Sequence, residues 1–221
     1  GKTDDTRIYE DLAERVAQAF CAEFVTPNGR VGANTQTAYV LALMFDLLPE
    51  SQREPAVRRL VADIEARDMH FATGFVGTAY IAHVLKRFGY LETAYDLLLQ
   101  DTCPSWLYAV TQGATTIWER WDGQRPDGSF QSPDMNSFNH YAYGAIGEWL
   151  YKIVAGLQLD PQRPAYKHII IHPQPGGGLT AARAAYQSIH GHIVSEWQLE
   201  DDRMQLNVTI PANTTATVVL P

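Results

Sequence analysis

One carboxylate in this sequence stands between two tryptophans, in the segment Trp118-Glu119-Arg120-Trp121-Asp122. Sugar rings stack their C–H faces on aromatic side chains, and hydrolysis of a glycosidic bond requires a pair of carboxyl groups. The segment offers both kinds of side chain within five residues. It therefore predicts a sugar-cleaving site in which Glu119 is the reactive carboxylate.

Two charged residues lie beside this glutamate. Arg120 and Asp122 can orient Glu119 or bind sugar hydroxyls through charge-assisted hydrogen bonds. The alternative is a structural ion pair on a loop that is anchored by Trp118 and Trp121. Spacing alone leaves both interpretations open.

A second polar and aromatic segment spans residues 135–144 and joins a loop to an expected helix. It contains Asn139 and His140 among several tyrosines and a phenylalanine. His140 can bind a substrate hydroxyl or donate a proton. A single histidine at a helix start is more often a structural group, so the residues by themselves do not decide its role.

The composition excludes several classes of function. The net charge of −8 argues against nucleic acid as a partner, since phosphate binding needs a basic surface. The longest apolar runs are too short to cross a membrane. Cys21 and Cys103 have no metal-ligand spacing and are expected to be free thiols. His168 and His172 lack an evident third ligand, and no phosphate-binding glycine motif is present, so we expect no metal and no cofactor.

The start of the sequence bears on localisation. No signal peptide is visible, which favours the cytoplasm. The chain opens with Gly1-Lys2 and not with Met, which indicates a start cut from a longer protein.

The first part of the chain reads as a series of helices with short links. Apolar and amphipathic helices alternate, as expected for the inner and outer rings of an αα-toroid or a segment of one. A simple helical bundle is the alternative, but it does not explain the aromatic loop at residues 117–136. Helices are expected over residues 6–25, 34–48 and 91–100, from Ser51, through Tyr80–Phe88, over 104–110, and over a long stretch from about 138 to 155.

After Pro161 the pattern changes to β-branched runs and alternating apolar residues. About five antiparallel strands are expected, forming a small β domain. The predicted fold is therefore mainly α with a β C-terminal region: part of an (α/α)6 toroid over residues 1–160, then an antiparallel β-sandwich over residues 161–221.

Several stretches together resemble bacterial α-L-rhamnosidases of glycoside hydrolase family 78, over essentially the whole chain. They are TQTAYVLAL (35–43), TGFVGT (73–78), PSWLYAVTQGATTIWERWDG (104–123), MNSFNHYAYGAIGEWLY (135–151) and YKHIIIHPQPGGGL (166–179). Within that family they look like the C-terminal half of the catalytic barrel followed by the C-terminal β domain.

The resemblance implies an inverting hydrolase that releases terminal L-rhamnose from glycosides. Glu119 matches the glutamate that serves the family as general base, and His140 matches a histidine that contacts the sugar. Trp118 and Trp121 look like subsite walls. Arg120, Asp122 and Asn139 are carried over as neighbours of these positions.

The family's general acid lies in the first half of the barrel, and no segment here matches that acidic motif. The hypothesis is therefore a rhamnosidase fragment, weakly active or inactive alone. Its expected partners are rhamnose-containing glycosides, and either a second copy of itself or an upstream catalytic half. Two alternatives remain: a non-catalytic carbohydrate-binding or scaffold protein, and another αα-toroid enzyme such as a uronyl hydrolase or polysaccharide lyase.

Overall fold

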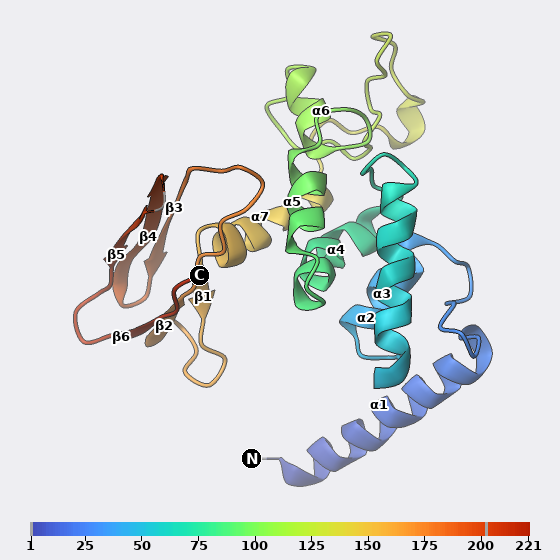
Figure 1. Cartoon of the computed structure of the whole chain (residues 1–221), viewed down its shortest axis with the longest axis horizontal. Helices are drawn as coiled ribbons and strands as arrows, with labels where there is room; N and C mark the ends of the chain where they lie inside the picture. Colours follow the sequence, from blue (N-terminus) through green and yellow to red (C-terminus); the bar gives the residue numbers. More distant parts are fainter. Residues whose placement is uncertain (1, 202) are drawn as a thin grey trace. The chain divides into compact units, whose positions relative to one another are not determined.

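The computed structural model describes residues 2–201 and 203–221. The chain divides into two compact units, Gly1–Gly144 and Ala145–Pro221. The first unit is helical, and the second holds all the strands that Figure 1 shows.

The helical unit is built from helices joined by short links. Helix α2 packs against both α3 and α4, and α4 packs against α5. Each of the helices α2 to α5 thus packs on a neighbour in the chain. The elements are α1 (Thr3–Phe24), α2 (Gln36–Met44), α3 (Glu50–Glu65), α4 (Phe75–Arg87), α5 (Leu91–Leu99), α6 (Trp106–Thr111) and the 3-10 turns Pro133–Met135 and Ala142–Ala145.

A buried glutamine at the start of α2 fixes the loop that leads into α4. Gln36 is fully buried, and its amide nitrogen donates to Asp63 Oδ2 at 3.0 Å and to the His70 carbonyl at 3.2 Å. Its amide oxygen accepts from the Ala72 backbone N–H at 2.7 Å. Because all these polar groups are satisfied, the side chain can stay buried and tie α2 to α3 and to residues 70–74.

Helix α4 approaches the start of α2 closely at a glycine. A Cβ atom on Gly77 would lie 2.7 Å from Thr37 Oγ1 and 2.9 Å from Thr73 Cγ2. No larger side chain fits without a shift of these neighbours, so the glycine sets the distance between the two segments.

Helix α1 has no buried residue. The large apolar side chains of α1 that remain exposed are Ile8 at 59%, Tyr9 at 68%, Leu12 at 43%, Val16 at 52% and Phe24 at 51%. Exposed apolar rows of this kind mark surfaces that bind other protein segments. In the part of the chain that the structure describes, no helix is long and apolar enough to span a membrane.

The second unit begins with the short helix α7 (Ile146–Trp149) and a π-helical turn (Leu150–Val154). Its strands form two three-stranded sheets, β1-β2-β6 and β3-β4-β5. The second sheet is an antiparallel meander, whereas β2 and β6 pair in parallel with His168 opposite Thr215. The strands are β1 (Leu157–Leu159), β2 (His168–Ile171), β3 (Ala181–Ser188), β4 (Gly191–Glu200), β5 (Arg203–Thr209) and β6 (Thr215–Val218).

The interior of the β unit is mainly apolar, and two of its buried polar side chains donate to backbone carbonyls. Apolar residues of β1, β2, β3 and β4 form one cluster: Ala155, Leu157, Ile169, Ile171, Ala184 and Ile193. The Trp197 indole donates to the Val154 carbonyl at 2.6 Å, and the Ser195 hydroxyl donates to the Ala155 carbonyl at 2.6 Å. These hydrogen bonds allow both side chains to be fully buried.

The long helix predicted from about residue 138 to 155 is wrong. The stretch is broken into a 3-10 turn, α7 and the π-helical turn, because the backbone before Ala142 pairs with residues 117–119 instead. The prediction of antiparallel strands also missed the parallel pair β2-β6, which joins segments far apart in sequence. The domain boundary at residues 160 and 161 stays a prediction; by contacts, residues 145–160 group with the β unit.

Candidate active site

Two loops of the helical unit pair through their backbones. The Glu119 N–H donates to the Ser137 carbonyl at 2.8 Å, and the His140 N–H donates to the Ile117 carbonyl at 2.8 Å. The Thr116 hydroxyl donates to the Phe138 carbonyl. This pairing brings together the two polar and aromatic segments that the sequence singled out.

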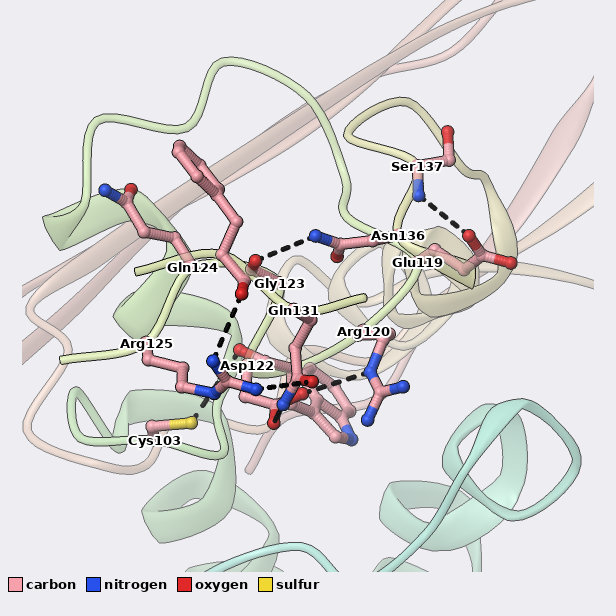
Figure 2. A network of polar contacts seen from close by, with 12 residues as sticks. Cys103, Glu119, Arg120, Asp122, Gly123, Gln124, Arg125, Gln131, Asn136 and Ser137 are labelled. Carbon is pink, nitrogen blue, oxygen red and sulfur yellow. Dashed lines mark hydrogen bonds and ion pairs between the residues drawn. The ribbon is translucent and has the colours of Figure 1, made fainter. Parts of the chain in front are cut away.

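The Glu119 carboxylate is held by one of its two oxygens. The Ser137 N–H donates to Glu119 Oε2 at 2.8 Å, as Figure 2 shows. Within the described residues no hydrogen bond reaches Oε1, and the side chain is half-buried. A carboxylate fixed through one oxygen and open at the other has the geometry of a general base.

A chain of alternating charged and amide groups lies beside Glu119. Arg120 Nε donates to Asp122 Oδ1 at 3.2 Å, and the Gln131 amide nitrogen donates to Asp122 Oδ2. The Gln131 amide oxygen accepts from Arg125 Nη2 at 2.9 Å. Figure 2 shows these four side chains in succession. The structural ion pair considered for Arg120 and Asp122 therefore exists, and it extends to a third and fourth residue.

Glu119, Arg120 and Asp122 line a pocket of about 310 Å³. Its two carboxylates are Glu119 and Asp122, and its cation is Arg120. Burial raises the pKa of Tyr143 to about 12, so its phenol stays protonated at neutral pH. The lining residues are Gly74, Phe75, Glu119, Arg120, Trp121, Asp122, Met135 and Tyr143.

The Trp121 indole forms one wall of the pocket. Its ring stacks on Tyr143 with centroids 3.8 Å apart, and on Phe71 with centroids 5.2 Å apart. Its Nε1–H donates to the Thr73 carbonyl at 3.0 Å. The indole is thus held rigidly by two stacked rings and one hydrogen bond.

His140 lies behind the pocket and does not line it. Its ring stacks on Phe75 at 4.7 Å and on Tyr141 at 5.4 Å, and its Nδ1 accepts from the Ala142 N–H at 3.2 Å. The Tyr141 side chain is 88% exposed. His140 therefore has a fixed ring orientation next to the pocket residue Phe75.

Two predicted residues have other surroundings. Trp118 is only 7% exposed and packs edge-on against Phe138 at 5.0 Å, away from the pocket lining. Asn139 is exposed, and no side-chain hydrogen bond is found for it among the described residues. The roles of Trp118 as a subsite wall and of Asn139 as a ligand stay predictions.

The sequence did not indicate several contributors. Phe75, Tyr143 and Met135 line the pocket from segments that were noted for other residues. Ser137 acts through its backbone N–H, and Gln131 lies in a polar loop, so neither carries a sequence signal. The described residues hold no group of three or more His, Cys, Asp or Glu side chains that could bind a metal ion.

Both units match families of known proteins. Residues 1–154 match the bacterial alpha-L-rhamnosidase 6 hairpin glycosidase domain, and residues 156–221 match the bacterial alpha-L-rhamnosidase C-terminal domain. An α-L-rhamnosidase of Streptomyces avermitilis is 48% identical over 217 residues, covering 98% of this chain and 21% of that protein. One from Formosa agariphila is 43% identical over 223 residues, covering 100% of this chain and 24% of that protein.

Solved structures agree. The crystal structure of the Streptomyces avermitilis enzyme complexed with L-rhamnose matches with a TM-score of 0.92 at 46% identity, over 98% of this chain and 21% of that one. The native enzyme of Aspergillus terreus matches with a TM-score of 0.94 at 38% identity, over 100% of this chain and 26% of that one. The chain thus spans about a quarter or less of these relatives.

These matches confirm the predicted fold class and do not favour the binding-protein or other-toroid alternatives. The chain belongs to the bacterial α-L-rhamnosidase family, with its six-hairpin glycosidase domain followed by the family's C-terminal domain.

Proposed function

We propose that this chain supplies the general-base side of an inverting α-L-rhamnosidase site, acting on glycosides that end in L-rhamnose. The observation that carries the proposal is the Glu119 carboxylate, held at Oε2 by Ser137 and open into a pocket walled by Trp121. The relative from Streptomyces avermitilis that was crystallised with L-rhamnose supports the choice of sugar.

In this mechanism Glu119 takes a proton from a water molecule through its open oxygen. The water attacks the anomeric carbon on the face opposite the leaving group, and the configuration inverts. The Ser137 N–H stabilises the carboxylate and fixes its direction. Trp121 and Phe75 form an apolar part of the pocket wall beside the sugar.

The second carboxyl group is the general acid, and Asp122 does not fit that role. Both of its oxygens accept hydrogen bonds, one from the Arg120 guanidinium. Both oxygens are thus engaged within the protein, and neither is left to face a leaving-group oxygen. We propose that the acid comes from outside these 221 residues, either from an upstream half in the same protein or from a partner chain.

The exposed apolar row of α1 is a surface on which such a half or a second copy can pack. Light scattering of the isolated chain tests this, and we expect a mass above that of a monomer. A strictly monomeric chain that hydrolyses aryl L-rhamnosides at a full rate would show that the acid lies within it.

Glu119→Gln tests the base. The amide keeps the shape but cannot accept a proton, so in the protein in which this chain naturally occurs we expect kcat to fall by about 10²- to 10⁴-fold with KM little changed. The substrate is an aryl α-L-rhamnoside, and NMR of the first-formed sugar reports its configuration. Undiminished turnover would exclude Glu119 as base, and retained configuration would exclude inversion.

A further inference from the structure

We propose that Asp122 is a positioning residue. It holds the Arg120 guanidinium in the pocket, and Arg120, not Asp122, donates hydrogen bonds to the sugar. This rests on the proposed function of the same pocket, and it separates two residues that the sequence could only name as neighbours of Glu119.

The carboxylate of Asp122 is already used by the protein. Its Oδ1 accepts from Arg120 Nε at 3.2 Å, and its Oδ2 accepts from the Gln131 amide. The two charged side chains are 39% and 37% exposed. An ion pair with that exposure contributes little to folding stability. Its consequence is therefore geometric: it fixes the plane and direction of the guanidinium.

Arg120 keeps its outer donors free for a ligand. Only Nε faces Asp122, and across the described part of the chain no hydrogen bond from Nη1 or Nη2 is found. Figure 2 shows a dashed line to Asp122 from Nε alone and none from the two terminal nitrogens. A planar, permanently charged group with paired donors suits two neighbouring hydroxyls of a pyranose ring.

The chain after Asp122 forms a small hairpin in which Gln124 pairs with Phe130, and residues of this hairpin hold Asp122 in place. The Gln131 amide cannot flip, because its nitrogen donates to Asp122 while its oxygen accepts from Arg125 Nη2. Arg125 is itself fixed by the Ser129 hydroxyl at 3.2 Å and the Phe130 carbonyl at 3.1 Å. A series of hydrogen bonds thus runs from Arg125 through Gln131 and Asp122 to Arg120 in the pocket. Each group determines the orientation of the next.

A double-mutant comparison tests the proposal in the protein in which this chain naturally occurs. We expect Arg120→Ala to raise KM for an aryl α-L-rhamnoside by about 10- to 100-fold, the loss of hydrogen bonds from a charged donor. Asp122→Asn should raise KM by about tenfold with kcat within about twofold. Because Asp122 acts through Arg120, the double variant should be no worse than Arg120→Ala alone.

Chemical rescue gives a readout that a purely structural role would not move. Guanidinium ion at millimolar concentration should lower KM in Arg120→Ala, since Asp122 Oδ1, held in place by the Gln131 amide at Oδ2, still offers it an acceptor. It should fail in the double variant. Asp134→Asn is the control. This exposed carboxylate hydrogen-bonds with Ser132 alone among the described residues, so its removal should leave KM unchanged.

Two results would overturn the proposal. If the increases in KM of Arg120→Ala and Asp122→Asn multiply in the double variant, Asp122 contacts the sugar itself. The second result is an Asp122→Asn variant with a lowered melting temperature but with KM and kcat at wild-type values, which would indicate a purely structural role. If the wild-type protein neither hydrolyses L-rhamnosides nor binds L-rhamnose, the proposed function fails first, and the positioning role fails with it.

Discussion

His140 in the helical unit and His168 in the β unit are both held by hydrogen bonds, but to different degrees. His168 is 8% exposed, and its two ring nitrogens pair with Thr215 Oγ1 at 2.7 Å and Thr217 Oγ1 at 2.9 Å. His140 has a hydrogen bond at Nδ1 alone among the described residues. An imidazole with both nitrogens used joins two strands, whereas one with a free nitrogen can still bind a ligand.

Other polar side chains of the two units differ in the same way, in how many of their atoms form hydrogen bonds. In the β unit the buried Ser195 and Trp197 donate to backbone carbonyls. Around the pocket, Glu119 and Arg120 keep unused hydrogen-bonding atoms within the described structure. Because both side chains are partly exposed, these open atoms are available to a ligand in the pocket.

Trp197→Ala should give the largest effect on stability. The indole is fully buried and donates to Val154, so we expect the free energy of unfolding of the β unit to fall by about 3–5 kcal/mol. Urea unfolding measures it, with the exposed neighbour Gln198→Ala as control. A loss as small as that of the control would mean that Trp197 is not part of the packed interior.

Gly77→Ala extends the test to the helical unit. The added Cβ meets Thr37 and Thr73, so overpacking should lower the free energy of unfolding by about 1–3 kcal/mol. Thermal unfolding measures it. Gly147→Ala is the matched control, since a Cβ there meets nothing within 4 Å and the position is helical. Equal stability changes in the two variants would contradict the close approach at Gly77.

Replacing His140 should affect substrate binding, whereas replacing His168 should affect stability. His140→Ala should raise KM for an aryl L-rhamnoside by about tenfold, which is about 1.4 kcal/mol, with little change in stability, because the pocket residue Phe75 loses the ring on which it stacks. His168→Ala should lower the free energy of unfolding by about 1–3 kcal/mol, because it removes both side-chain hydrogen bonds from β2 to Thr215 and Thr217 of β6. Steady-state kinetics and urea unfolding of both variants decide, and reversed results would refute the assignment.

Asp160→Asn should give the smallest effect, and one that depends on pH. The pKa of Asp160 is lowered, mainly by the Gln162 N–H that it accepts at 2.9 Å and then by Arg163. The folded state therefore holds its proton less tightly than the unfolded state. The stabilisation is present above about pH 4 and is lost as pH falls through the lowered pKa. Wild type and variant should thus converge in acid, and a constant difference down to pH 2 would contradict this origin.

Local patterns predicted the parts of the structure that depend on neighbouring residues. The fifth helix was expected over 91–100 and is found at Leu91–Leu99, because its apolar spacing is regular. The segment around Glu119 was found because its side chains lie together in the chain as well as in the pocket.

The missed features depend on contacts between distant segments. The helix expected from about residue 138 was wrong because the Glu119 and His140 N–H groups pair between the two loops. The Ser137 N–H that holds Glu119 is a backbone group, which any residue type supplies. Whether a polar side chain is saturated, as Asp122 is, follows only from the folded arrangement.

The parallel pair of β2 and β6 has a consequence for how the β unit folds. The His168–Thr215 contact joins residues 47 apart in sequence, whereas β3, β4 and β5 pair as successive hairpins. On the ribosome the meander can form as it emerges, but the sheet β1-β2-β6 cannot be completed before Val218 has been synthesised. Until then one edge of β2 stays unpaired and open to aggregation, so chaperone dependence should concentrate in this late interval.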